Sequence, residues 1–316
     1  MINAVGEFCG LAGSDVCGRC VALGGAHEAS RLPTVTPDEH RELFGGLLRN
    51  ARHVVAPSKN TADYVSSVFP AVKVTTLPHP QDPQAFPVAI REGSDDEIVL
   101  LGGIGPHKGS TKLLEVARRA RLSHPHLSFR VIGHTDIDEA LTGVGNVTIT
   151  GKFEPAELPA LLAKTRGRLA LFLNGWPETF SYTLTEAVQA GFLPLVPDIG
   201  APAERVKAAG FGVVFDFPID AVQVLRLLDS LRNGDARVDG DPRSFRLDET
   251  WKEQALRVFQ PEAPKRAVGA QVPVAKPSAQ PIRPKGPTRP RSAKRPRRAA
   301  QTHLLSKRES VSLPSA

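Results

Sequence analysis

The sequence is poor in cysteine and contains no long apolar run. With only three cysteines in 316 residues, a reducing, cytosolic setting is the default expectation. No apolar run approaches the roughly 18 residues that a transmembrane helix needs. The first residues also lack the basic stretch and apolar stretch that together mark a secretory signal. We therefore expect a cytoplasmic protein without a membrane-spanning helix.

The net charge of +7 is unevenly distributed along the chain. Residues 260–316 contain 13 Lys/Arg and 2 Asp/Glu, a balance of +11, so the other residues keep 27 basic and 31 acidic side chains, a balance of −4. This last segment also has ten prolines, few large apolar residues and no aromatic ones. It cannot bury enough surface to offset its chain entropy, and we predict a disordered tail.

The chain of 316 residues has room for one large or two ordinary domains, and its overall hydrophobic content of 41% allows a buried core. Short apolar runs alternate with helical stretches between residues 97 and 232. The predicted strands are 97–104, 127–133, 146–151, 168–174, 192–197 and 211–215, and the predicted helices include 110–123, 154–165 and 220–233. This alternation is typical of a Rossmann-like, doubly wound parallel α/β sheet covered on both faces.

A shorter α/β segment precedes this sheet. Residues 37–50 and 60–69 are predicted helices, the first with Thr36 as its N-cap, and residues 52–58 and 72–78 are predicted strands. Residues 79–96 follow as a linker. We therefore divide the chain into residues 1–85, 86–259 and 260–316.

Ligands of open α/β sheets bind beyond the carboxyl ends of the strands, and three stretches of this chain lie there. The first, "LLGGIGPHKGS", places Gly102, Gly103 and Lys108 between a strand and a helix. Its glycines, helix-start amides and lysine suit a diphosphate, although it matches neither the Walker A loop nor the dinucleotide fingerprint. A glycine-rich turn with a solvated lysine is the alternative. The second, "VIGHT", adds His134, which by itself says little.

The third stretch, "PETFSYTLTEAVQAG", holds Glu178 and Glu186 where a loop becomes a helix. One interpretation is structural: Thr183 and Glu186 match a capping box, and Glu178 favours the positive end of the helix dipole. The other is functional: each carboxylate accepts hydrogen bonds from the hydroxyls of a nucleotide sugar, while amides near 180–183 meet its phosphate or sugar. The residues alone leave both interpretations open.

These motifs resemble the C-terminal half of a retaining glycosyltransferase of the GT-B fold, of the group 1 type with an E-x7-E motif. "PETFSYTLTEAVQAGFLPLVPDIGAPAE", "GPHKGSTKLLEVA" and "ITGKFEPAELPALL" follow the family pattern in family order, and the resemblance covers about residues 50–232. It implies a hexosyltransferase-like enzyme that moves a sugar from a nucleotide diphosphate to a glycan or lipid-linked acceptor in cell-surface polysaccharide synthesis. Such an enzyme can lie peripherally at the inner face of the membrane.

The resemblance also implies a role for each matched residue. Glu178 and Lys108 would be catalytic, with Glu178 on the donor sugar and Lys108 on the diphosphate. The substrate-binding residues would be Gly102, Gly103, His134, Lys152, Phe153, Phe180, Ser181, Tyr182, Thr183 and Glu186, with Glu186 on the ribose and Lys152–Phe153 against the base. Positive charge and amide dipoles would stabilise the leaving diphosphate, so neither a metal nor another cofactor is expected.

The chain departs from the family pattern in three ways. The family usually has an arginine at the position of Gly103, so half of the positive clamp is missing. The glycines that flank the motif phenylalanine are here Thr179 and Ser181, so the backbone there is less permissive. Residues 1–85 suffice only for a remnant of the acceptor-binding N-terminal domain, which a partner could complete.

Other classes of function stay open at this stage. The chain could be a catalytically incomplete module that only binds a nucleotide sugar, or a sugar epimerase of similar fold. The basic tail could bind nucleic-acid phosphates or an anionic membrane surface, although it lacks aromatic residues for base stacking. Cys9, Cys17 and Cys20, with His27, could bind zinc or be free thiols.

Overall fold

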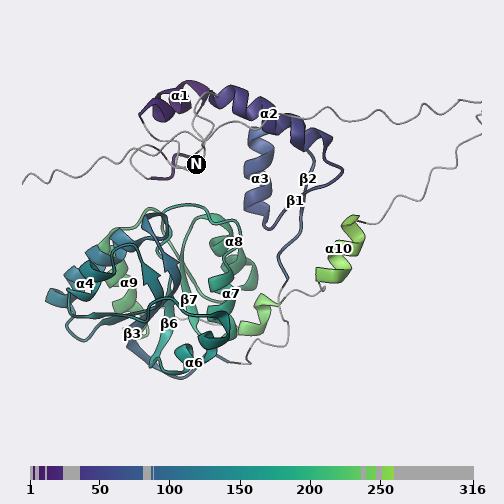
Figure 1. Cartoon of the computed structure of the whole chain (residues 1–316). Coiled ribbons are helices and arrows are strands. Elements are labelled where there is room, and N and C mark those ends of the chain that lie inside the picture. The colour runs from purple at the N-terminus through teal and green to yellow at the C-terminus, as the bar shows by residue number, and fades with distance from the viewer. Residues whose placement is uncertain are drawn as a thin grey trace, which may run out of the picture. The chain divides into compact units, whose positions relative to one another are not determined.

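We analysed a computed structural model that describes residues 3, 7–10, 13–23, 36–80, 87, 89–235, 240–246 and 251–259. The predicted tail of residues 260–316 lies outside the described residues. The elements before residue 80 and the larger sheet that follows are shown in Figure 1.

A six-stranded sheet forms the main body, and its strand order is β5-β4-β3-β6-β7-β8. Every pair of neighbouring strands in it is parallel. The strands are β3 (Ser94–Ile104), β4 (Ser128–Thr135), β5 (Val147–Ile149), β6 (Gly167–Leu171), β7 (Leu193–Pro197) and β8 (Val213–Phe215). The predicted Rossmann-like, doubly wound sheet is thereby confirmed.

Helices cover this sheet on both faces (Figure 1). They are α4 (Ser110–Ser123), α5 (Asp138–Thr142), α6 (Leu158–Ala163), α7 (Tyr182–Gln189), α8 (Gly200–Ala209) and α9 (Ala221–Asn233). Helices α4 and α9 pack on each other, whereas α7 and α8 contact β7 from the other side. Parallel sheets need this double cover because both of their faces are apolar.

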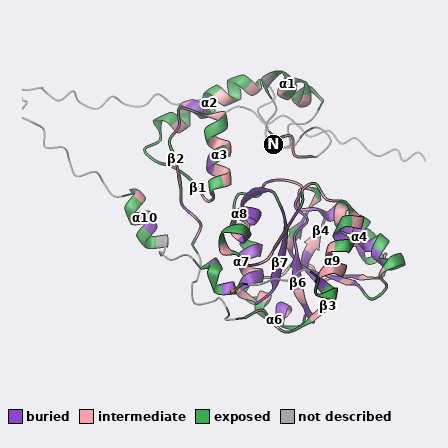
Figure 2. Cartoon of the chain, turned by 180° about the vertical axis from the view of Figure 1, so that it is seen from behind, coloured by how far each residue is buried: buried purple, intermediate pink, exposed green. Residues whose placement is uncertain are grey.

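The core follows from the sequence pattern of these elements. Residues Ile98–Leu101 of β3 are all buried, as expected of a central strand, and Figure 2 shows the buried residues gathered along β6 and β7. Helix α4 contributes Leu113, Val116, Ala117 and Ala120 at a spacing of three to four residues. The sheet and its helices thus share one apolar core.

The segment before residue 80 contains the two predicted helices, shorter forms of the two predicted strands, and one helix, α1, that the sequence analysis did not predict. It contains α1 (Ser14–Ala22), α2 (Pro37–Asn50), β1 (Val54–Ala56), α3 (Lys59–Val68) and β2 (Val74–Thr76), with β1 and β2 paired in parallel. Thr36 caps α2 in a full capping box with Glu39. After the sheet come the 3₁₀ turn η4 (Pro242–Phe245) and helix α10 (Trp251–Phe259).

The described residues bear on two expectations, one about membrane-spanning helices and one about a zinc site. No helix in this part of the chain is both long and apolar enough to cross a bilayer. Cys9, Cys17 and Cys20 are thiols outside any disulfide and are partly exposed, and Cys17 Sγ accepts a hydrogen bond from Arg41 at 3.3 Å. No cluster of three or more His, Cys, Asp or Glu side chains suited to a metal occurs among the described residues, and His27 lies outside them. The zinc alternative therefore finds no support in this part of the chain.

Candidate functional site

The site lies where the direction of strand connection reverses. From β3 the chain passes through α4 to β4 on one side, and β6 lies on the other side of β3. Such a switch point leaves a crevice at the carboxyl ends of the two strands. The turn between β3 and α4 (residues 105–109) and the loop between β6 and α7 (residues 172–181) both lie here. The turn that is predicted to bind the diphosphate is therefore beside the loop that is predicted to bind the sugar, which we call the sugar loop.

The turn after β3 is a short 3₁₀ segment, η2 (Pro106–Lys108), that leads into α4. Gly109 has φ +91°, and a Cβ there would lie 2.3 Å from the carbonyl oxygen of Leu173. Only glycine therefore allows the loop after β6 to approach so closely. Gly102 shows the same constraint, because a Cβ on it would lie 2.9 Å from Cγ2 of Thr183.

Lys108 and Glu178 meet in this crevice. The Lys108 Nζ lies 3.2 Å from Glu178 Oε1, and the Glu178 side chain is 8% exposed. Together with Asn174 and Thr183 they line one small cavity. The other carboxylate oxygen, Oε2, is buried and has no hydrogen-bond partner. The structure thus joins the two residues that the resemblance marks as catalytic, and it leaves one strong acceptor unused.

Buried polar atoms without partners gather around this pair. Among the described residues six such side-chain atoms occur: Asn60 Oδ1, Ser110 Oγ, Asn146 Oδ1, Asn174 Nδ2, Trp176 Nε1 and Glu178 Oε2. Four of the six belong to the start of α4 and the loop between β6 and α7. A buried polar group without a partner typically costs about 1–3 kcal/mol. Their concentration at the switch point is what a polar ligand site requires.

The capping-box interpretation of Thr183 and Glu186 is wrong. Helix α7 begins at Tyr182, so both residues lie inside it, and its N-cap is Ser181, whose side chain makes no capping hydrogen bond. Ser181 has φ +70° and ψ 91°, so the backbone turns sharply just before the helix. Glu186 is half-buried, and burial raises the pKa of its carboxyl group. Its place on the second turn of α7 therefore has no helix-capping explanation.

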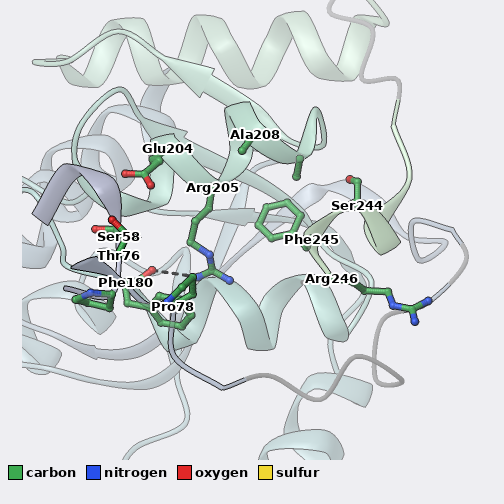
Figure 3. A pocket seen from close by; sticks show the side chains of 12 residues that line it. Ser58, Thr76, Pro78, Phe180, Glu204, Arg205, Ala208, Ser244, Phe245 and Arg246 are labelled. Atoms are coloured by element: carbon green, nitrogen blue, oxygen red, sulfur yellow. Dashed lines mark hydrogen bonds between the residues drawn. The ribbon is translucent and has the colours of Figure 1, made fainter. Parts of the chain in front are cut away.

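Arg205 of α8 makes hydrogen bonds to the end of the sugar loop. The sequence analysis did not predict this residue. Its guanidinium donates to the carbonyl oxygens of Phe180 and Ser181 and to Thr185 Oγ1, at 3.0, 2.9 and 2.7 Å. It also lies 4.2 Å from the centre of the Phe180 ring. Burial lowers the pKa of Arg205 to about 10. Figure 3 shows Arg205 between Phe180 and Phe245 in the wall of a cavity of about 240 Å³.

The segment before residue 80 also contacts this loop. Thr61 Oγ1 donates to the carbonyl oxygen of Thr179 at 3.4 Å. The ring of His79 stacks on Tyr182 at 5.2 Å and meets Phe180 edge-on at 4.9 Å. Phe180 is buried, whereas Tyr182 is exposed. The predicted loop residues 180–183 are thus held from two sides, by Arg205 and by His79.

The other predicted residues lie along the same edge of the sheet. His134 is opposite Gly103 in the β3–β4 register, and its ring occupies the space beside Gly103, where a Cβ would lie 3.1 Å from the imidazole. Lys152 and Phe153 follow β5, the outermost strand, with Lys152 exposed and Phe153 partly buried against the core. They are therefore separated from Glu178 by the width of β3 and β4.

The sequence model of the glycosyl transferases group 1 family matches residues 83–244, just over half of the chain. The chain belongs to the group 1 glycosyltransferases. The match contains the whole six-stranded sheet, the Lys108 turn and the Glu178 loop. No curated protein matches the chain.

Solved glycosyltransferases share the fold of this group 1 member at low identity. The crystal structure of TarM has a TM-score of 0.58 and 14% identity over 74% of this chain and 48% of TarM. Alr3699/HepE from Anabaena, solved in complex with UDP, has a TM-score of 0.53 and 15% identity over 71% of this chain and 64% of HepE. Sucrose-phosphate synthase from Thermosynechococcus elongatus has a TM-score of 0.50 and 18% identity, over 77% of this chain and 62% of the synthase. The chain therefore spans less than two thirds of each of these structures.

Proposed function

We propose that the chain binds a nucleoside-diphosphate sugar at the switch point and transfers its sugar to a glycan or lipid-linked acceptor. The observation that carries this proposal is the Lys108–Glu178 pair, with the second oxygen of Glu178 buried and unpartnered. A cation for a diphosphate and an acceptor for a sugar hydroxyl lie side by side at the place where α/β sheets bind nucleotides. HepE, whose structure is similar, was solved in complex with UDP-glucose.

In this proposal the donor lies along the carboxyl edge of the sheet. The diphosphate meets Lys108 and the glycines Gly102 and Gly103, and the base reaches the Lys152–Phe153 turn after β5. His134, at the end of β4 between them, contributes its ring nitrogens to the same edge. Glu186 takes the ribose hydroxyls, and the backbone of residues 180–183 faces the sugar and the diphosphate.

The reaction proposed here breaks the bond between the anomeric carbon and the diphosphate. The diphosphate leaves with the bonding electrons and is stabilised by the Lys108 ammonium and by backbone amides. An acceptor hydroxyl forms the new bond and passes its proton to the oxygen of the departing diphosphate, with the configuration at the anomeric carbon retained. Glu178 holds the hydroxyls of the sugar in place, and no metal takes part.

The acceptor, the pathway and the surroundings of the protein belong to the same proposal. A polysaccharide precursor at the inner face of the membrane would bring the acceptor to the site, with the basic tail as an added contact to anionic lipid. Residues 1–85 would supply a remnant of the acceptor-binding domain, and a partner could complete it.

A module that only binds the donor is the second candidate, and one observation favours it. Gly103 stands where the family usually has an arginine. The remaining cation of the predicted diphosphate site, Lys108, forms an ion pair with Glu178. With half of the positive charge missing, the leaving group would be less stabilised and transfer would be slow. Release of free sugar from the donor, or its transfer to an acceptor, would separate the enzyme from the module.

Thermal unfolding of the full chain with UDP, GDP, ADP and their sugar conjugates tests donor binding. A ligand at about a hundred times its dissociation constant stabilises a protein by roughly 2.7 kcal/mol, a shift of several degrees for a domain of this size. We expect one nucleotide to give this shift, and Glu186→Ala to reduce it. Glu139→Ala, an exposed carboxylate on α5, is the matched control and should leave the shift unchanged. No shift with any of these nucleotides would contradict the proposal.

A further inference from the structure

Asn174 is a buried side chain in the site to which the resemblance gives no role. It follows β6, is 5% exposed, and lines the same small cavity as Lys108, Glu178 and Thr183. Its amide nitrogen Nδ2 has no hydrogen-bond partner, and neither has Glu178 Oε2 across the cavity lining. A residue with an unused donor and a residue with an unused acceptor therefore line the same small cavity.

The size and chemistry of this space identify its occupant. The cavity measures about 10 Å³, which is close to the smallest volume that holds one water molecule. It is too small for a sugar ring. A water can accept a hydrogen bond from Asn174 Nδ2 and donate one to Glu178 Oε2, which satisfies both buried atoms at once. The remaining lining consists of six apolar residues together with Lys108 and Thr183, and Lys108 already contacts Glu178 Oε1.

We propose that this cavity holds one ordered water that links Asn174 to Glu178, and that Asn174 thereby positions the Glu178 carboxylate for the donor sugar. The inference rests on the proposed donor site for its functional part. A carboxylate offers about four acceptor positions. Lys108 and the water occupy two of them, one on each oxygen, which fixes the plane of the carboxylate. The other two stay available for sugar hydroxyls.

This arrangement makes a prediction specific to the sugar. In the proposed donor pose the nucleotide portion contacts the Lys108 ammonium and the edge of β4 and β5 rather than the Glu178 carboxylate, so loss of the water should change the affinity for UDP little. A nucleotide sugar gains affinity over the nucleotide through Glu178. Asn174 is therefore a positioning residue whose removal should lower the preference for UDP-glucose over UDP, rather than nucleotide binding in general.

The test uses the full chain with Asn174→Leu, which keeps the volume but removes the donor, and Asn174→Ser, which keeps a hydroxyl and leaves room for the water. Asn146→Leu is the matched control, because Asn146 is also partly buried in this domain with an unpartnered oxygen, but it lies before β5. We expect the ratio of UDP-glucose to UDP affinity to fall about tenfold in Asn174→Leu, to recover in Asn174→Ser, and to stay unchanged in Asn146→Leu. Affinity for UDP alone should change less than twofold.

A crystal structure of the full chain gives a second, independent measurement. It should show one water within hydrogen-bond distance of Asn174 and Glu178 in the natural protein and none in Asn174→Leu. A dry cavity, or an equal loss of UDP and UDP-glucose in Asn174→Leu, would overturn the inference. If none of UDP, GDP and ADP binds the natural protein, the donor proposal fails on that result, whereas the density in the cavity still decides whether the water is present.

Discussion

Ser181 is the one non-glycine residue with positive φ among the described residues. It precedes α7 and stands where the group 1 pattern has a glycine. A side chain in this region costs roughly 1–2 kcal/mol, and the hydrogen bonds from Arg205 to the Phe180 and Ser181 carbonyls hold the backbone there nonetheless. The less permissive backbone expected from the sequence therefore appears as strain at one residue.

Replacement of Ser181 by glycine should stabilise the protein. The extra chain entropy of glycine costs roughly 0.5–1 kcal/mol, and the relief of the strain outweighs it. We expect the free energy of unfolding to rise by about 0.5–1 kcal/mol, which corresponds to a melting temperature about 1–4 °C higher. Thr179→Gly is the control, because Thr179 does not have a positive φ, and it should lower the melting temperature. Equal shifts in the two variants would contradict the strain at Ser181.

Sequence motifs predict which residues of the loops belong to the site, but they do not identify residues that reach the site only through the tertiary structure. Glu178 and Lys108 were predicted from loops at strand ends, and the structure joins them at 3.2 Å. Arg205 and Asn174 were missed. Arg205 donates to backbone carbonyl oxygens of a distant loop, and Asn174 lines a cavity, and no local sequence pattern predicts either arrangement. The sequence signal that could have indicated Arg205 is its position as a charged residue among the buried residues of α8. The roles of the predicted site residues stay predictions.

At the scale of elements, Glu97 joins three central strands. It is buried at the start of β3 and accepts hydrogen bonds from the Arg130 side chain of β4 and from the backbone amides of Arg166 and Gly167, at the start of β6. Burial by itself would raise its pKa, but these hydrogen bonds and the Arg130 charge together lower the pKa of the Glu97 carboxyl group. The ionised form therefore stabilises the order β4-β3-β6 on which the site depends.

Glu97→Gln should destabilise the protein at neutral pH, by roughly 2 kcal/mol for the loss of hydrogen bonds to a charged acceptor. The folded pKa lies below the unfolded one, so this stability is present above the unfolded pKa and is lost as pH falls through the folded pKa. Urea unfolding of both proteins from pH 7 to pH 3 should show the difference shrinking on acidification.

Asp96→Asn serves as the control for that measurement. Asp96 lies beside Glu97 and pairs with Arg232 at 3.1 Å, but both side chains are almost half exposed. An exposed pair is worth at most about 1 kcal/mol, so this variant should be close to neutral. A constant difference between Glu97→Gln and the natural protein over the whole pH range would contradict the role of the ionised carboxylate.

Element prediction succeeded where apolar periodicity is strong and failed at helix starts set by tertiary contacts. Helix α4 was predicted as 110–123 and is Ser110–Ser123, and α2 begins at its predicted cap. The strand predicted at 52–58 is only Val54–Ala56. The capping box was misplaced because the start of α7 is fixed by the Ser181 turn and by Arg205, rather than by a side-chain cap.

At the scale of the whole molecule, the fold class followed from alternation, whereas the strand order did not. Alternating strands and helices require a parallel sheet, but many orders satisfy the same pattern. The position of β3 between β4 and β6 determines where the switch point lies. The contacts that Thr61 and His79 make with the sugar loop join segments more than one hundred residues apart in the chain, and sequence spacing carries no information on them.

The charge imbalance of the chain leads to a prediction about residues 260–316. Their removal changes the net charge from +7 to −4, because they carry +11. We expect the shortened chain to keep its nucleotide-induced thermal shift. Binding of the full chain to anionic vesicles or duplex DNA, measured by sedimentation in 50 and 300 mM salt, should be strong only in the lower salt, and the shortened chain should not bind. Loss of the nucleotide shift would mean that the tail contributes to the donor site.

The glycines and the polar atoms of the site respond differently to natural selection. At Gly109 and Gly133 an added Cβ would meet backbone carbonyl oxygens at 2.3 and 2.1 Å, so selection for folding alone preserves these positions. The unpartnered atoms of Asn174 and Glu178 cost stability unless something binds there, so a lineage in which nothing binds there would gain stability from apolar residues at these two positions. Among descendants of this chain, drift at the polar pair with unchanged glycines would therefore mark the point at which the site lost its ligand while the fold was kept.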